Sequence, residues 1–161
     1  AQILGGGQES GRRAGTENVP GIAGFGAAAE AAASRDETTA IDALRQRIED
    51  GLRRMTPGLV IYGAGARRLP NTACVGLPGV AAETAVIALD LAGVAVSSGA
   101  ACSSGKVRPS HVLTAMGATA EAARSAVRIS LGWNSRNEDA ERLFAAWGER
   151  IVPLTQKRPA A

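Results

Sequence analysis

A single cysteine lies in a run of small residues, Ser97-Ser-Gly-Ala-Ala-Cys102-Ser-Ser-Gly-Lys106. Glycine, serine and alanine gain little from burial, so we expect this run to form an exposed, mobile loop. Lys106 and Arg108 follow the cysteine within six residues, and nearby positive charge favours the thiolate, which is the nucleophilic form of cysteine. The pattern predicts a reactive thiol at Cys102. The plainer interpretation is a surface loop with an incidental cysteine.

The N-terminal part is rich in glycine between Gly5 and Gly15, and it leads through Thr16 and Asn18 into an alanine-rich helical pattern. Consecutive glycines allow backbone N–H groups to approach a ligand closely. A hydroxyl and free N–H groups directly before a helix suit a phosphate group. The alternative is that Thr16 or Asn18 simply caps the helix.

Three further residues have side chains that could take part in chemistry. Arg128 lies within a predicted strand, on the face opposite Val127 and Ile129, and the pattern alone indicates a solvated or salt-bridged arginine. His111 is the only histidine of the sequence, and without an evident partner it is better explained as structural or solvated. Cys74 has apolar neighbours, which predicts a buried, inert thiol.

The elements that would position these residues follow from the spacing of apolar side chains. Residues 19–55 are helical in pattern, in two pieces, and the charged residues of the second piece, Arg45 and Glu49 among them, fall on faces away from its apolar stripe. The remaining elements are strands at 59–62, 69–76, 94–96 and 126–131, a buried helix at 81–91, a short helix at 110–116 capped by Ser110, and a final helix with a Ser135/Glu138 capping box. This order predicts an α+β fold, a small mixed or antiparallel sheet covered by helices.

Composition excludes several classes of function. Hydrophobic residues make up 45% of the 161 residues, enough for the core of one domain. The net charge of +3 comes from scattered arginine pairs, so nucleic-acid binding is not indicated. Two cysteines form neither a disulfide framework nor a zinc site, and no metal is expected. The longest uncharged stretch, residues 18–29, is too short to span a membrane, and without a signal peptide we expect a cytoplasmic protein.

The order of the motifs is specific. GGGQE.GRRAGTEN occupies residues 5–18, SSGAACSSG residues 97–105, PSHVL residues 109–113, and RIS.G ends at Gly132. This pattern resembles that of the group I cysteine desulfurases, which belong to the class V aminotransferase-like branch of the fold-type I pyridoxal-phosphate enzymes. The resemblance extends from Gly5 to about Trp147.

The resemblance implies roles for three residues. Cys102 would attack the sulfur of L-cysteine and carry it as a persulfide, with release of L-alanine. Arg128 would bind the carboxylate of the substrate through its planar fork. Thr16 would reach the phosphate of pyridoxal phosphate in the partner subunit, so the enzyme would be a homodimer with shared active sites. The persulfide sulfur would then pass to an acceptor, such as an iron–sulfur scaffold protein.

By the same resemblance, residues 1–18 are a cofactor-phosphate and dimer-contact segment, and residues 19–152 are the C-terminal small domain with the cysteine loop 97–108. Residues 153–161 are then a flexible tail. The Schiff-base lysine of such enzymes lies in their N-terminal half, and the only lysines here, Lys106 and Lys157, do not match it. We therefore expect a fragment that is inactive alone. The alternatives are a non-catalytic docking or dimerisation module and a thiol redox sensor, although no resolving cysteine is evident.

Overall fold

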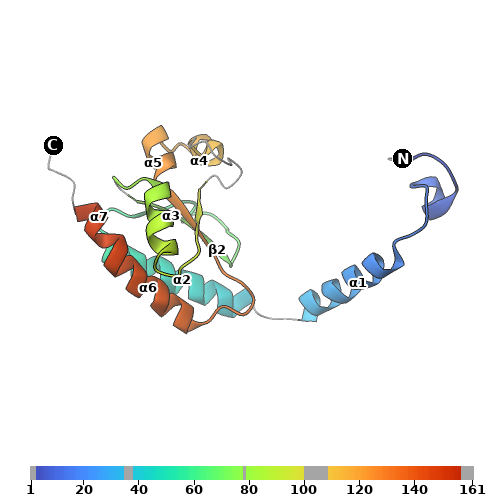
Figure 1. Cartoon of the computed structure of the whole chain (residues 1–161), viewed down its shortest axis with the longest axis horizontal. Helices are drawn as coiled ribbons and strands as arrows, with labels where there is room; N and C mark the ends of the chain where they lie inside the picture. The colour runs from blue at the N-terminus through green and yellow to red at the C-terminus, as the bar shows by residue number, and fades with distance from the viewer. Residues whose placement is uncertain (1–2, 35–37, 78, 100–108, 157–161) are drawn as a thin grey trace. The chain divides into compact units, whose positions relative to one another are not determined.

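The computed structural model describes residues 3–34, 38–77, 79–99 and 109–156 (Figure 1). The chain divides into two compact units, Ala1–Asp36 and Glu37–Ala161. The first long helix thus belongs to the same unit as the glycine-rich segment, whereas the sequence predicts a first boundary at residue 18. The roles given to the three segments stay predictions.

The N-terminal unit consists of a short 3-10 helix, η1 (Gln8–Gly11), and the helix α1 (Val19–Ser34). The N–H of Gly21 donates to Oδ1 of Asn18 at 3.1 Å, so Asn18 and not Thr16 caps α1. The large apolar side chains of α1 are exposed, Phe25 to 78%. Such a helix gains little from packing within its own unit, because most helical stability in proteins comes from burying one face.

The second unit holds the remaining elements. In chain order these are α2 (Thr38–Met55), β1 (Val60–Ile61), β2 (Thr72–Gly76), α3 (Ala82–Asp90), β3 (Ser97–Ser98), α4 (His111–Ala115), α5 (Ala120–Arg124), β4 (Ala126–Ser130), α6 (Asn137–Arg150) and α7 (Val152–Gln156). The four strands form one sheet in the order β1-β2-β4-β3, and every neighbouring pair is antiparallel. The predicted α+β class with a small antiparallel sheet is confirmed.

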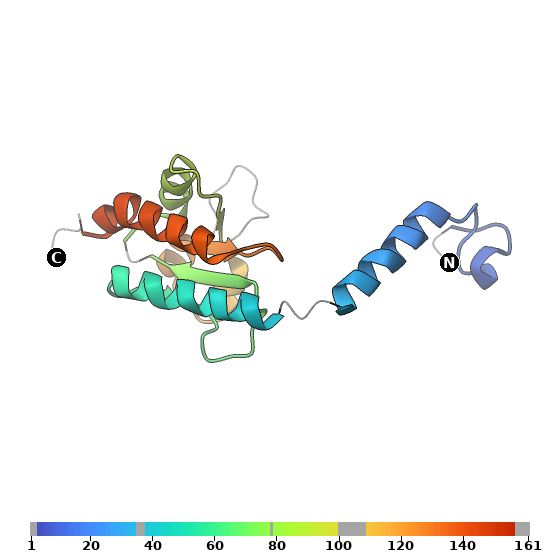
Figure 2. The same ribbon diagram turned by 90° about the horizontal axis from the view of Figure 1, so that it is seen from below.

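The two faces of this sheet bury different sets of side chains. Val75 and Val127 point into the main core, which α2, α3 and α6 complete with a fully buried Trp147. Helices α2 and α6 lie side by side along this face (Figure 2). The opposite face carries a smaller cluster built by α4 and α5 around Leu113 and Ala126. The apolar periodicity of α2 fixes the first arrangement, since its stripe must be buried against the sheet.

Two predicted elements differ from the structure in detail. The strand expected at 94–96 is wrong, because Gly93 turns with a positive φ of 77° and the N–H of Val94 bonds back to the carbonyl of Leu89 at 2.9 Å. These residues therefore close the end of α3, and pairing with β4 begins only at Ser97. The helix expected to be buried on all sides, α3, exposes 60% of Ile87 and is buried on one side only.

Helix boundaries differ near the C-terminal end as well. The capping pair of α6 lies one residue later than predicted, because the N–H of Arg136 donates to Asp139 Oδ2 at 2.9 Å while Ser135 Oγ accepts from Gly132. Helix α5 was not predicted; Thr119 caps it by accepting from the N–H of Ala122 at 3.2 Å. Helix α7 covers the start of the expected tail, whose last residues, 157–161, lie outside the described part. No helix in the described part of the chain is long and apolar enough to cross a membrane.

Candidate functional site

One row of residues crosses all four strands at Arg128. Arg128 of β4 is the register partner of Cys74 in β2 on one side and of Ser97 in β3 on the other. The row continues to Tyr62, directly after β1, whose N–H donates to the carbonyl of Cys74 at 2.9 Å. Residues directly opposite each other in a sheet share a face. Four side chains therefore lie in a row on one face of the sheet, in the order Tyr62, Cys74, Arg128 and Ser97.

This row belongs to the sheet face that carries α4 and α5. The predicted alternation is confirmed, because Val127 and Ile129 are buried in the main core while Arg128 between them is only half-buried. Tyr62 and Cys74 pack against the small cluster of this second face. The hydroxyl of Tyr62 donates to the carbonyl of Ala122 in α5 at 3.1 Å, which ties α5 to the row.

Arg128 differs from the other arginines of low exposure in this unit because it forms no ion pair with an acidic side chain among the described residues. Its Nε is buried without a hydrogen-bond partner, as is the Nε of Arg45. Arg45 and Arg68, in contrast, each bind a carboxylate. A buried N–H without an acceptor costs roughly 1–3 kcal/mol. Without a carboxylate beside it, the guanidinium of Arg128 suits an anionic partner from outside the described residues.

Cys74 lies beside this arginine as a free, half-buried thiol. Burial raises the pKa of Cys74, and the positive charge of Arg128 offsets only part of that effect. The thiol is therefore protonated at neutral pH and a weak nucleophile. The expected low reactivity agrees with this geometry. The surroundings of Cys74 differ from the predicted apolar neighbours, because the charged Arg128 lies directly opposite it in the sheet.

The structure describes the first three residues of the cysteine loop 97–108 and continues after the loop at Pro109. At the start of the loop, the N–H of Gly99 donates to the carbonyl of Ala126 at 2.7 Å, which holds the end of β3 against β4. After it, the buried Ser110 caps α4 by accepting from the N–H of Leu113. Cys102 itself, with Lys106, lies outside the described residues. Both ends of the loop are thus anchored on the sheet face that carries Arg128.

His111 follows that capping serine in the first turn of α4. Its side chain is exposed, and no acidic side chain in the described ranges forms an ion pair with it. The geometry gives it no partner of the kind that a catalytic base requires. The interpretation as a solvated histidine is kept.

The N-terminal unit holds Thr16 as an exposed residue, three positions before α1 begins at Val19. Arg13 Nη1 donates to the carbonyls of Gly15 and Thr16, both at 2.9 Å, and so fixes this turn, where Gly15 has a φ of +95°. Because Asn18 caps the helix, the Thr16 hydroxyl is left to bind something else. A hydroxyl beside a guanidinium at a helix start suits a phosphate.

A pyridoxal-phosphate cofactor would find only part of its site here. The turn around Thr16 fits the phosphate end of the group. The described residues include no lysine, so no amine among them can hold the aldehyde carbon. This part of the chain therefore fits the cofactor at its phosphate and does not complete the site.

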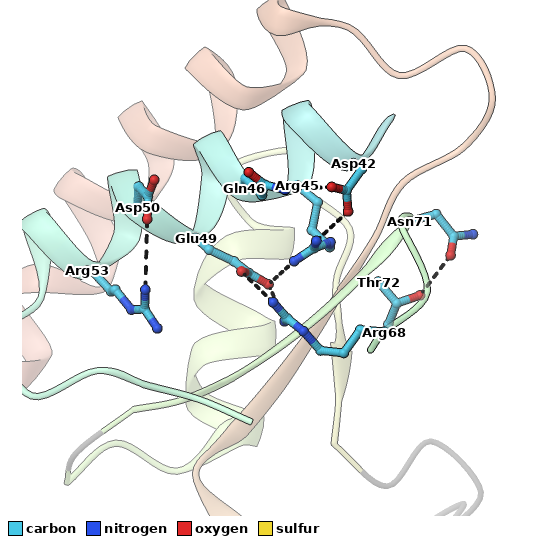
Figure 3. Close-up of polar contacts among 9 residues, drawn as sticks. All are labelled: Asp42, Arg45, Gln46, Glu49, Asp50, Arg53, Arg68, Asn71 and Thr72. Carbon is cyan, nitrogen blue, oxygen red and sulfur yellow. Dashed lines mark hydrogen bonds and ion pairs between the residues drawn. The ribbon is translucent and has the colours of Figure 1, made fainter. Parts of the chain in front are cut away.

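A buried group of charges positions the connection between β1 and β2. Glu49 of α2 is 4% exposed and accepts from Arg45 at 3.0 Å and from both terminal nitrogens of Arg68 at 2.6 and 3.0 Å (Figure 3). Arg45 also bonds to Asp42. Arg45 and Glu49 lie outside the hydrophobic core, as their positions beside the apolar stripe predict. They are nevertheless buried, because Arg68 reaches over from the β1–β2 connection and covers them. This connection leads directly into β2, which carries Cys74.

A cavity of about 500 Å³ opens between β1 and α5. Its lining includes Tyr62 and the exposed charges of Glu121 and Arg124, and not Arg128. Shape alone would have placed a ligand there. The guanidinium of Arg128, which has no ion pair among the described residues, is the stronger indication of a ligand site. A buried polar group without a partner requires an explanation, whereas a cavity can be empty.

The family model for aminotransferase class-V matches residues 5–143. The chain belongs to the aminotransferase class-V family. It is 43% identical over 159 residues to a cysteine desulfurase of Gluconacetobacter diazotrophicus, which covers 98% of this chain and 40% of that protein. The cysteine desulfurase NifS of Azotobacter vinelandii is 42% identical over 159 residues, with 98% and 40% covered.

A solved structure gives the same relationship. The NifS-like protein of Rickettsia africae matches with a TM-score of 0.76 and 38% identity, covering 91% of this chain and 38% of that one. Cysteine desulfurases of the aminotransferase class-V family are pyridoxal-phosphate enzymes of fold-type I. The chain spans about 40% of the length of the curated relatives it matches. It corresponds to a part of such an enzyme.

Proposed function

We propose that this chain is the part of a pyridoxal-phosphate-dependent cysteine desulfurase that binds the substrate carboxylate and carries the sulfur-accepting thiol. The observation that carries the proposal is that Arg128, whose Nε is buried without a partner, forms no ion pair with an acidic side chain among the described residues, unlike Arg45 and Arg68. A planar guanidinium without a protein partner suits a carboxylate, which it can bind through two parallel hydrogen bonds. The motif resemblance assigns Arg128 the same role.

Cys102 is the proposed nucleophile. It is three positions after Gly99 in the sequence, so the covalent chain keeps the two Cα atoms within about 11 Å of each other. Gly99 bonds to Ala126, two residues before Arg128 on the same strand. A thiol on this loop thus starts from a point beside the proposed carboxylate site, which supports the assignment of both residues to one reaction.

The reaction divides between the chain's own residues as follows. Arg128 binds the carboxylate of L-cysteine and thereby orients the substrate. The thiolate of Cys102 attacks the substrate sulfur; a sulfur–sulfur bond forms, the carbon–sulfur bond breaks, and its electron pair stays with the carbon that becomes the methyl group of alanine on protonation. Pyridoxal phosphate, when bound, supplies the electron sink that makes this bond labile. Thr16 would hold its phosphate.

Assembly and sulfur delivery are also part of the proposal. The apolar side chains of α1, Val19, Ile22 and Phe25, are exposed within their own unit and require a cover outside it. A second copy that receives the phosphate contact of Thr16 supports a homodimer. The persulfide would pass to an acceptor such as an iron–sulfur scaffold protein, consistent with the NifS and IscS names of relatives. A thiol that must be reduced for each turnover favours a reducing compartment such as the cytoplasm.

Substitution of Arg128 in the complete enzyme tests the carboxylate site. Arg128→Ala should lower kcat/KM for L-cysteine by roughly 30- to 1000-fold, the cost of losing a charged hydrogen-bonding group. Arg128→Lys should also be poor, because a point charge cannot reproduce the fork. Arg124→Ala, which removes an exposed arginine from the neighbouring α5, is the matched control and should keep normal kinetics. Normal alanine release by both Arg128 variants would refute the proposal.

A further inference from the structure

The register places Cys74 closer to Arg128 than any other cross-strand neighbour. The pairs Asn71–Leu131 and Leu77–Ser125 at the two ends of the β2–β4 ladder are joined by backbone hydrogen bonds, of 2.8 and 3.2 Å. Such pairs alternate along an antiparallel ladder with pairs that are not hydrogen-bonded and whose side chains lie closer, at about 4.5 Å between Cα atoms. By this count Cys74 and Arg128 form one of the close pairs.

The neighbours of Arg128 in the row are all without charge. Tyr62 and Ser97 bear hydroxyls, and the raised pKa of Cys74 keeps its thiol neutral at neutral pH. A carboxylate at any of these positions would pair with the guanidinium and occupy the fork. The contrast lies in the same unit, where Glu49 takes up Arg68 through two hydrogen bonds. The charge of Arg128 is therefore available because its closest neighbour is a small neutral side chain.

We propose that Cys74 is a positioning residue that determines specificity: as a neutral side chain packed beside Arg128, it keeps the guanidinium free for the carboxylate of an α-amino-acid substrate. This inference rests on the proposed role of Arg128. It gives Cys74 no part in sulfur transfer. The thiol acts through the arginine. It determines whether the site prefers a ligand with a carboxylate over the amine that lacks the carboxylate.

Two ligands separate this role from a general defect. L-Cysteine carries the carboxylate, and cysteamine is the same molecule without it. In the complete enzyme, Cys74→Asp should raise KM for L-cysteine about 10- to 100-fold, the loss expected when one charged hydrogen bond is withdrawn from the substrate, with kcat changed less than twofold. The inhibition constant of cysteamine should stay unchanged. Cys74→Asn has the same shape without the charge and should keep the preference for L-cysteine.

Chemical modification of Cys74 after folding makes the same comparison of a charged with a neutral side chain, and it does not depend on the folding of Cys74→Asp. In the complete enzyme with Cys102→Ser and any cysteines outside these 161 residues replaced, Cys74 is the only thiol left. Prolonged treatment with iodoacetate or iodoacetamide then adds an anionic or a neutral group of nearly equal size. Calorimetry should show that the anionic adduct weakens binding of L-cysteine and not of cysteamine, relative to the neutral adduct.

The outcomes distinguish the role of Cys74 from the carboxylate-binding role of Arg128, on which it rests. Equal affinities for the Asp and Asn variants, or for the two adducts, would overturn the role of Cys74 while Arg128→Ala still weakened L-cysteine alone. If Arg128→Ala left the preference for L-cysteine over cysteamine intact, the carboxylate site itself would be wrong. A fall in the affinity of both ligands in Cys74→Asp but not in Cys74→Asn would also refute the inference, because a freed guanidinium affects only the carboxylate.

Discussion

Replacement of Glu49 by glutamine should destabilise the fold far more than its position on a charged helix face indicates. The Glu49 carboxylate is 4% exposed and accepts three hydrogen bonds from Arg45 and Arg68 (Figure 3). An amide keeps the size of the side chain, but it removes the charge and turns one donor group toward the guanidinium groups. Arg45, which is 6% exposed, would then keep only Asp42 as its ionic partner.

The size of the effect follows from this geometry. Removal of one partner from a buried ion pair costs roughly 3–5 kcal/mol, because the remaining charge is left without compensation. The Arg68 side chain is 19% exposed and can turn toward water, which places Glu49→Gln at the lower end, about 3 kcal/mol. Since a domain of this size shifts by about 3–5 °C for each kcal/mol, the melting temperature should fall by about 10 °C.

Urea unfolding of the whole chain measures this difference without the ionic screening that guanidinium chloride would add. Asp50→Asn is the matched control, since it makes the same chemical change on the same helix in an exposed pair with Arg53 at 3.8 Å. It should cost less than about 1 kcal/mol. Equal urea midpoints for Glu49→Gln and Asp50→Asn, at an unchanged m-value, would show that the buried cluster does not stabilise the fold.

The remaining predictions concern acid and thiol reactivity. Burial alone would raise the pKa of Glu49, but the hydrogen bonds that it accepts from Arg68 and Arg45 outweigh burial and lower this pKa. The stabilisation that Glu49 contributes is therefore complete above the pKa of the unfolded state, about 4.3. It is lost as the pH falls through the pKa of the folded state. The urea midpoint should therefore fall more steeply below about pH 5 in the wild type than in Glu49→Gln, and parallel acid limbs would contradict this. Iodoacetamide at neutral pH should modify Cys102 before Cys74, because burial raises the pKa of Cys74. Peptide mass spectrometry over time decides the order, and earlier modification of Cys74 would contradict it.

The sequence by itself determined the elements whose signals are local. The apolar spacing of α2, the Ser110 cap of α4 and the alternation of β4 each depend on residues within a few positions of one another, and all three are present. The family could likewise be identified from motif order, because the residues of a motif are adjacent in the chain. The same alternation placed Arg128 on the face away from the core, as the structure has it.

Only the tertiary structure decided which residues stand next to one another across the sheet. The pairing of Cys74 with Arg128 joins residues far apart in sequence, and a shift of one position would move either side chain to the other face. The burial of Glu49 likewise depends on Arg68, which comes from a different element. The apolar spacing of one helix predicts that its charged side chains face solvent. Whether such a side chain is buried depends instead on which other elements pack against that helix. For this reason the unpaired state of Arg128 became visible only with the strands in place.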